Sequence, residues 1–93
     1  MSVIANTSVL IALSSINRLN LLKALSKEVM VPKAVMEEYG EPLPKWVKVI
    51  DVKDKQLVRA LLELLHKGEA ETIALAIEVK ADIVILDLSL IHI

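Results

Sequence analysis

The chain has 93 residues, of which 55% are hydrophobic and 25% charged, and its formal net charge is −1. This length suits one small domain, and the apolar content excludes a disordered tail. The absence of cysteine excludes disulfides and thiolate sites. The scarcity of aromatic residues, one Trp and one Tyr, argues against a stacking platform for RNA bases. No apolar run approaches the roughly 20 residues that cross a bilayer. We therefore expect a cytoplasmic protein without a membrane segment.

The first half of the chain alternates short apolar runs with amphipathic stretches. A strand at residues 3–5 leads into a helix over 8–16, because residues 6–8 all carry side chains that cap helices. A second short helix is expected over 18–25, where leucines recur at helical spacing. A buried strand at 29–31 ends at Pro32, which favours the start of a helix over 33–39. Gly40 is the expected stop of that helix.

The second half repeats this alternation. Residues 41–44 contain two prolines and form a loop, and 47–52 is expected to be a half-exposed strand. Asp54 caps a predicted helix that ends just before Gly68. The next helix is expected from Glu69 to about Lys80. The last strand is the apolar run bounded by the acids Asp82 and Asp87.

Strands that are apolar on both faces and alternate with helices predict a mainly parallel sheet covered on both sides. The expected fold class is therefore a three-layer α/β/α domain spanning residues 1–93. In such folds, ligands bind beyond the carboxyl ends of the strands.

Four oxygen-bearing side chains are expected at that edge: Asn6, Glu38, Glu69 and Asp87. Three carboxylates and an amide close together repel one another without a cation, and Mg²⁺ or Mn²⁺ prefers such ligands. Each residue also has a purely structural explanation. Asn6 suits a helix cap, Glu69 suits the positive end of a helix dipole, and Glu38 suits a solvated helix face.

The order of these segments resembles the PIN-domain family across nearly the whole chain. The segment 4–13 resembles the opening of the family's sequences, and the segment 31–38 resembles their second motif, which ends in the second acid. The segments 68–76 and 81–87 resemble the third and fourth motifs. The resemblance implies a Mg²⁺- or Mn²⁺-dependent ribonuclease that cleaves RNA, of the kind found as the toxin of toxin–antitoxin pairs. It also implies a homodimer and a small antitoxin-like protein that fills the acidic cleft.

Carried over residue by residue, the resemblance makes Glu38, Glu69 and Asp87 the catalytic, metal-holding acids. Glu37 is the alternative to Glu38, and Glu71 is the alternative to Glu69. Ser8 matches a hydroxyl that supports the first acid.

The chain departs from the family's pattern at two places. Asn6 replaces the first acid, which removes one negative charge and is expected to weaken metal binding. After Asp87 the sequence ends at Ile93, without the helix and strand that complete the family's domain. We expect this shorter end to leave apolar surface and an open sheet edge. Residues 88–93 are expected to pair with a second copy of the chain.

The remaining candidates have structural interpretations. His66 is expected near a helix C-terminus, Trp46 packs a loop onto the domain, and His92 has no motif around it. Lys45, Lys48, Lys53 and Lys55 form a solvated face rather than a phosphate-binding track. Two functions remain open: a metal-dependent endoribonuclease of weakened activity, and a non-catalytic domain that acts through dimerisation or by binding a partner protein.

Overall fold

The computed structural model describes residues 1–86 and the backbone of residues 89–92. The strands within these residues are β1 (Ser2–Ala5), β2 (Glu28–Pro32), β3 (Val47–Ile50), β4 (Ile83–Leu86) and β5 (Ser89–His92). The helices in the same part of the chain are α1 (Thr7–Ser15), α2 (Asn20–Leu25), α3 (Lys33–Tyr39), α4 (Lys55–Leu61) and α5 (Lys67–Glu78). Among the described residues, every strand and helix that the sequence predicted is present.

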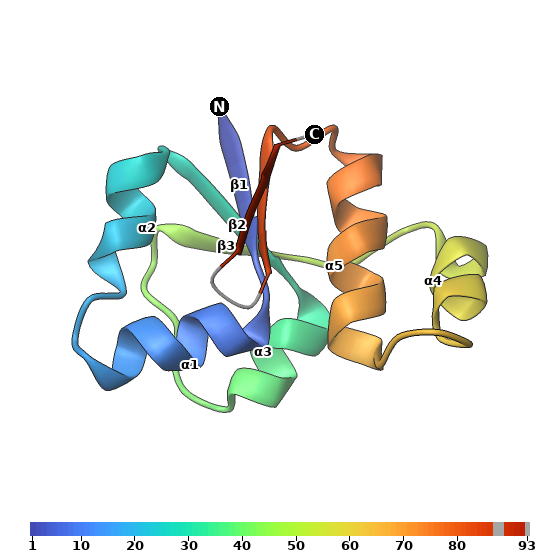
Figure 1. The fold of residues 1–93 in the computed structure, drawn as a ribbon, viewed down its shortest axis with the longest axis horizontal. Coiled ribbons are helices and arrows are strands. Elements are labelled where there is room, and N and C mark those ends of the chain that lie inside the picture. Colours follow the sequence, from blue (N-terminus) through green and yellow to red (C-terminus); the bar gives the residue numbers. More distant parts are fainter. Residues whose placement is uncertain (87–88, 93) are drawn as a thin grey trace.

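The strands form a single sheet in the order β3-β2-β1-β4-β5. The first four are mutually parallel, and β5 is antiparallel to β4. In Figure 1 the sheet is seen nearly edge-on, with α2 on one side and α4 and α5 on the other. The predicted three-layer α/β class with a mainly parallel sheet is confirmed.

Two hydrophobic cores lie on the two faces of the sheet, because side chains along a strand alternate between faces. On β1, Val3 and Ala5 join the core that contains α1 and α2, whereas Ile4 joins the core that contains α4 and α5. These three side chains of β1 are fully buried. This two-sided burial explains why the strands read as continuous apolar runs rather than as alternating ones.

Helix boundaries in the first half follow the caps expected from the sequence. Asn6 is the N-cap of α1, and its side-chain oxygen accepts from the backbone N–H of Val9. Helix α3 begins directly after Pro32 and ends at Gly40, whose φ of 73° is left-handed. Glycine adopts this conformation without the clash that a Cβ would cause.

The boundary between α4 and α5 differs from the prediction. Helix α4 ends at Leu61, and α5 begins at Lys67, so that Gly68 lies inside the first turn of α5 instead of ending α4. Leu64, which lies within the range predicted for that helix, is 86% exposed in the connection. Gly68 is buried within α5 because the Glu38 carboxylate occupies the place where a Cβ would lie. Tertiary packing thus overrides the helix-stop preference of this glycine.

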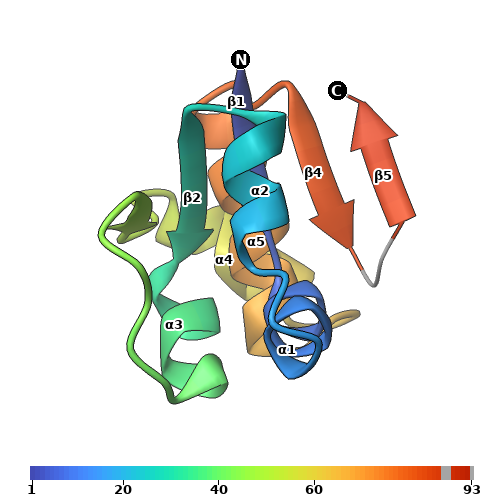
Figure 2. The same ribbon diagram turned by 90° about the vertical axis from the view of Figure 1, so that its left-hand side faces the viewer.

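The end of the chain forms the last strand of the same sheet. Ser89–His92 pairs antiparallel with β4 of the same chain, with Leu86 opposite Ser89 and Ile83 opposite His92. Figure 2 shows β5 at the edge of the sheet beside β4. One edge of β5 is therefore paired within the chain, and its other edge is the end of the sheet, so dimerisation itself stays a prediction.

One surface ion pair makes a pH-dependent prediction. Lys55 Nζ lies 2.9 Å from Asp51 Oδ1, and this hydrogen bond, with the lysine charge, holds the pKa of Asp51 below its ordinary value. The stabilisation by the pair is complete above the pKa of the unfolded chain and is lost as pH falls through the lower, folded pKa. We expect Lys55→Gln to raise the pKa of Asp51, measured by NMR of its carboxyl carbon. An unchanged pKa would contradict the pairing.

Candidate functional site

The candidate site lies at the carboxyl edge of the parallel strands. Asn6 directly follows β1, Glu38 lies in the last turn of α3, and Glu69 lies in the first turn of α5. In Figure 1, α1, α3 and the start of α5 gather at this edge, at the bottom of the view. Asp87, the fourth predicted residue, lies outside the described residues.

The carboxylate of Glu38 is held between α1 and α5. Its Oε1 accepts a hydrogen bond of 2.7 Å from the Thr7 hydroxyl, which α1 supplies from its first residue. On the other side it lies against Gly68, where an added Cβ would be 3.0 Å from the Glu38 carboxyl carbon and closer still to Oε1. The side chain is nevertheless 40% exposed. Glu38 is therefore oriented by its neighbours and still reachable from solvent.

His66 connects the two described acids of the site. Its Nε2 lies 3.1 Å from Glu69 Oε1, and its Nδ1 lies 3.9 Å from Glu38 Oε2. The first distance is that of an ion-pair contact, whereas the second is too long for a hydrogen bond. Glu38 of α3 and Glu69 of α5 are 31 residues apart in the sequence, and both lie next to the imidazole ring of His66.

The sequence interpretation of His66 was wrong. This residue is the N-cap of α5 rather than a residue near the C-terminus of the preceding helix, and its side chain caps no backbone N–H. The error follows from the misplaced end of α4. A usable signal was present, because His66 and Glu69 are three residues apart, and residues at that spacing meet on one helix face.

Asn6 is buried, with 5% exposure, and has a structural task of its own. Its Oδ1 accepts from Val9 N at 3.1 Å, and its backbone N–H donates to Ile85 O at 3.3 Å. The first contact starts α1, and the second joins the end of β1 to β4. The cap interpretation of Asn6 is confirmed, and an amide oxygen has a second lone pair for a further contact.

The structure separates the alternative acids. Glu71 is 7% exposed, and its Oε1 accepts from the Ala34 backbone N–H at 3.1 Å, so it caps the first turn of α3. Glu37 is exposed, and it is Glu38 that approaches His66. Within residues 1–86, the hydroxyl that reaches an acid of the site is that of Thr7, whereas Ser8 is exposed.

The remaining candidates keep their structural interpretations where they can be followed. Trp46 packs against the core on the α1–α2 face of the sheet. The four lysines of the basic cluster are all exposed on and around β3. Of these, Lys55 is paired with Asp51. The side chain of His92 lies outside the described residues.

The donors at this edge suit a hard divalent cation in their chemistry. Glu38 and Glu69 offer accessible carboxylate oxygens, which Mg²⁺ and Mn²⁺ prefer. The first turn of α5 adds positive potential from unpaired backbone N–H groups. Among the side chains up to Leu86, no three His, Asp or Glu groups are arranged to hold a metal ion. The described acids are therefore a pair that requires a further ligand.

Replacement of Gly68 by alanine should change the metal affinity of the site while leaving the stability of the fold nearly unchanged. The new methyl group would displace the Glu38 carboxylate, which is the end of a flexible side chain, and would break the contact with Thr7. Alanine in a helix interior is worth about 0.5–1 kcal/mol over glycine, so we expect Gly68→Ala to melt within a few degrees of the parent. Mn²⁺ affinity, measured by calorimetry, should fall about tenfold. Unchanged affinity would show that the position of Glu38 does not matter.

One comparison with known proteins finds a match to the chain. A family model described as a PIN domain matches residues 2–90, nearly the whole chain. No curated protein and no solved structure matched. No helix in residues 1–86 has the length and apolar character of a membrane span.

Proposed function

The chain belongs to the PIN-domain family, and from this membership we propose that it is a metal-dependent endoribonuclease with a weakened metal site. PIN domains are nuclease-related and generally use divalent metal ions. The observation that carries the proposal is the pairing of Glu38 and Glu69 across His66 at the carboxyl edge. A helix-dipole effect explains Glu69 alone, but not the approach of an acid from α3.

In this proposal Glu38, Glu69 and Asp87 hold Mg²⁺ or Mn²⁺, and the Asn6 amide is a neutral fourth group. The bound ion supplies activation of water and neutralises charge on the phosphodiester. Thr7 keeps Glu38 oriented through its hydroxyl. His66 keeps Glu69 oriented through the contact at Nε2. Glu71 takes no part in the chemistry, because it caps α3.

A second function is favoured by one observation, the Asn6 contact. The Asn6 oxygen already accepts from Val9 N, and the residue brings no charge to balance a cation. A domain of this kind keeps the fold without cleaving RNA and acts by dimerisation or by binding a partner protein. The toxin–antitoxin setting, the antitoxin-like partner, the homodimer and the cytoplasmic location are proposed with the family and rest on the resemblance.

Reversion of Asn6 to aspartate tests the two functions against each other. Aspartate also caps helices, so Asn6→Asp should fold normally while adding one negative charge to the site. For the nuclease we expect measurable Mn²⁺ binding by calorimetry, at least about tenfold tighter binding after reversion, and metal-dependent cleavage of a labelled single-stranded RNA. If neither protein binds Mn²⁺ at millimolar concentration, the nuclease proposal fails and the non-catalytic function stands.

A further inference from the structure

The imidazole of His66 contacts the two described acids of the site and caps no helix. His66 is the N-cap residue of α5, but its side chain accepts no hydrogen bond from a backbone N–H. It is 63% exposed, and its contacts are with Glu38 and Glu69. Histidine is the commonest protein ligand of metal ions, so an exposed imidazole at a proposed metal site is a candidate ligand.

The spacing of two atoms suits neighbouring ligands of one ion. His66 Nε2 lies 3.1 Å from Glu69 Oε1. Two ligand atoms that each lie about 2.1 Å from an ion are roughly 3.0 Å apart in octahedral geometry and roughly 3.4 Å apart in tetrahedral geometry. An ion could therefore contact both atoms with little movement of either side chain. Waters and the other acids of the site would complete its coordination.

The charges at this edge favour a cation beside the imidazole. Glu38 Oε2 lies 3.9 Å from His66 Nδ1, so a second carboxylate lies next to the ring and attracts a cation bound there. Asn6 brings no charge, and its Oδ1 already accepts from Val9 N. The imidazole thus supplies a ligand atom in place of the carboxylate that Asn6 lacks.

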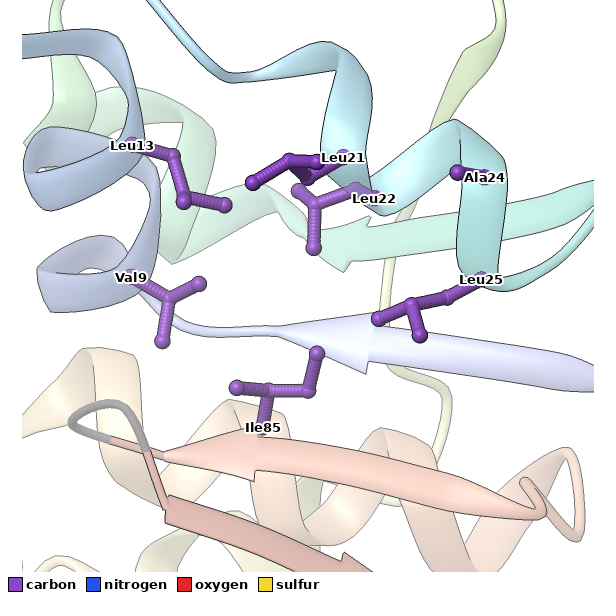
Figure 3. A pocket seen from close by; sticks show the side chains of 7 residues that line it. All are labelled: Val9, Leu13, Leu21, Leu22, Ala24, Leu25 and Ile85. Atoms are coloured by element: carbon purple, nitrogen blue, oxygen red, sulfur yellow. The ribbon is translucent and has the colours of Figure 1, made fainter. Parts of the chain in front are cut away.

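The apolar pocket elsewhere in the fold offers no comparable group. It lies between α1, α2 and β4 and has a volume of about 410 Å³. The side chains around it, which include Leu13, Leu22 and Ile85, are all hydrocarbon (Figure 3). Because none of these lining side chains can bind a cation, the polar edge is the place for the ion.

We propose that His66 Nε2 and Glu69 Oε1 are neighbouring ligands of the divalent ion at this site, and that His66 makes the site prefer transition-metal ions such as Mn²⁺ and Zn²⁺ over Mg²⁺. Mg²⁺ takes oxygen ligands and releases its water reluctantly, whereas transition-metal ions accept imidazole. The inference rests on the proposed function for the presence of an ion, and it adds a ligand and a preference among the ions.

Calorimetric titration of the parent chain and two His66 variants with Mg²⁺, Mn²⁺ and Zn²⁺ tests this preference. His66→Gln removes the nitrogen ligand, so we expect Mn²⁺ and Zn²⁺ each to bind at least about tenfold more weakly and Mg²⁺ to bind nearly as before. His66→Glu supplies a charged oxygen ligand, so Mg²⁺ should bind more tightly and the ratio of Mn²⁺ to Mg²⁺ affinity should fall. The side chain is exposed and caps no N–H, so both variants should fold, which a thermal melt verifies.

NMR of the labelled histidine ring nitrogens identifies the ligand atom directly. We expect Zn²⁺ to give Nε2 of His66 the signal of a metal-bound nitrogen, with the ring proton on Nδ1, and Mg²⁺ to leave Nε2 without such a signal. His92→Gln is the matched control, because it removes the other imidazole of the sequence. It should leave both the Zn²⁺ affinity and the His66 signals unchanged.

The outcomes separate this inference from the proposed function. Equal Mn²⁺ affinity in the parent and in His66→Gln would overturn the inference and leave the nuclease standing. Loss of Zn²⁺ binding in His92→Gln, or an unchanged ratio of Mn²⁺ to Mg²⁺ affinity in His66→Glu, would overturn it as well. Zn²⁺ bound through His66 Nε2, without RNA cleavage in the presence of any of the three ions, would support the inference and remove the nuclease. Binding of none of the ions would remove both.

Discussion

Glu38→Gln and Glu69→Gln should each reduce Mn²⁺ affinity at least about tenfold, a loss that even an outer-shell change can produce. Glutamine keeps the size of the side chain but removes the charge that attracts the cation. Both side chains are 40% exposed, so the substitutions should leave the folded chain intact. Calorimetric titration with Mn²⁺ measures the loss, and RNA cleavage should decline with it.

Glu37→Gln is the matched control for this experiment. It removes the same charge from the neighbouring residue of α3, which is exposed, whereas His66 lies beside Glu38. We expect this variant to bind Mn²⁺ like the parent chain. Equal losses in Glu37→Gln and Glu38→Gln would mean that only net charge matters, and the proposed ligand assignment would then be wrong.

Glu71→Ala should destabilise the fold by about 2 kcal/mol, because the buried N–H of Ala34 loses a charged acceptor. The contact is 3.1 Å long and joins α5 to the first turn of α3. For a chain of this size the loss corresponds to a fall in melting temperature of about 10 °C. Thermal and urea unfolding, followed by circular dichroism, measure the effect.

Glu71→Gln tests whether the loss of stability comes from the hydrogen bond to Ala34 N. The glutamine side chain keeps a carbonyl oxygen that can accept from Ala34 N, so the loss should be smaller than with alanine. Glu69→Gln should melt close to the parent, since Glu69 is part of the exposed edge. A Glu71 variant that keeps its stability but loses Mn²⁺ binding would reverse the roles assigned to the two acids.

Local chemistry was enough to predict the order and type of the elements. The buried residues of strands such as β1 are all apolar, because both faces of the sheet are covered. The helix starts at Asn6 and Asp54 and the stop at Gly40 depend on capping and on left-handed backbone, which are properties of a few neighbouring residues. The types of neighbouring residues are therefore enough to predict these helix boundaries, and no distant contact is needed.

The end of α4 and the start of α5 could not be predicted in the same way. Gly68 has the local preference of a helix stop, but it lies in the first turn of α5, where Glu38 of α3 occupies the space that a Cβ would need. The role of His66 depended on this boundary and was missed with it. A contact between residues 30 positions apart leaves no trace in local spacing.

The choice among neighbouring acids also required the tertiary structure. Glu69 and Glu71 both follow Gly68 and have the same side chain, and only the packing of α5 against α3 buries one and exposes the other. The sequence by itself determined the parallel α/β fold and the edge at which polar side chains collect, because strand polarity decides that edge. Which carboxylates meet there, and around which histidine, was decided by helix packing, because it sets the rotation of each helix relative to its neighbours.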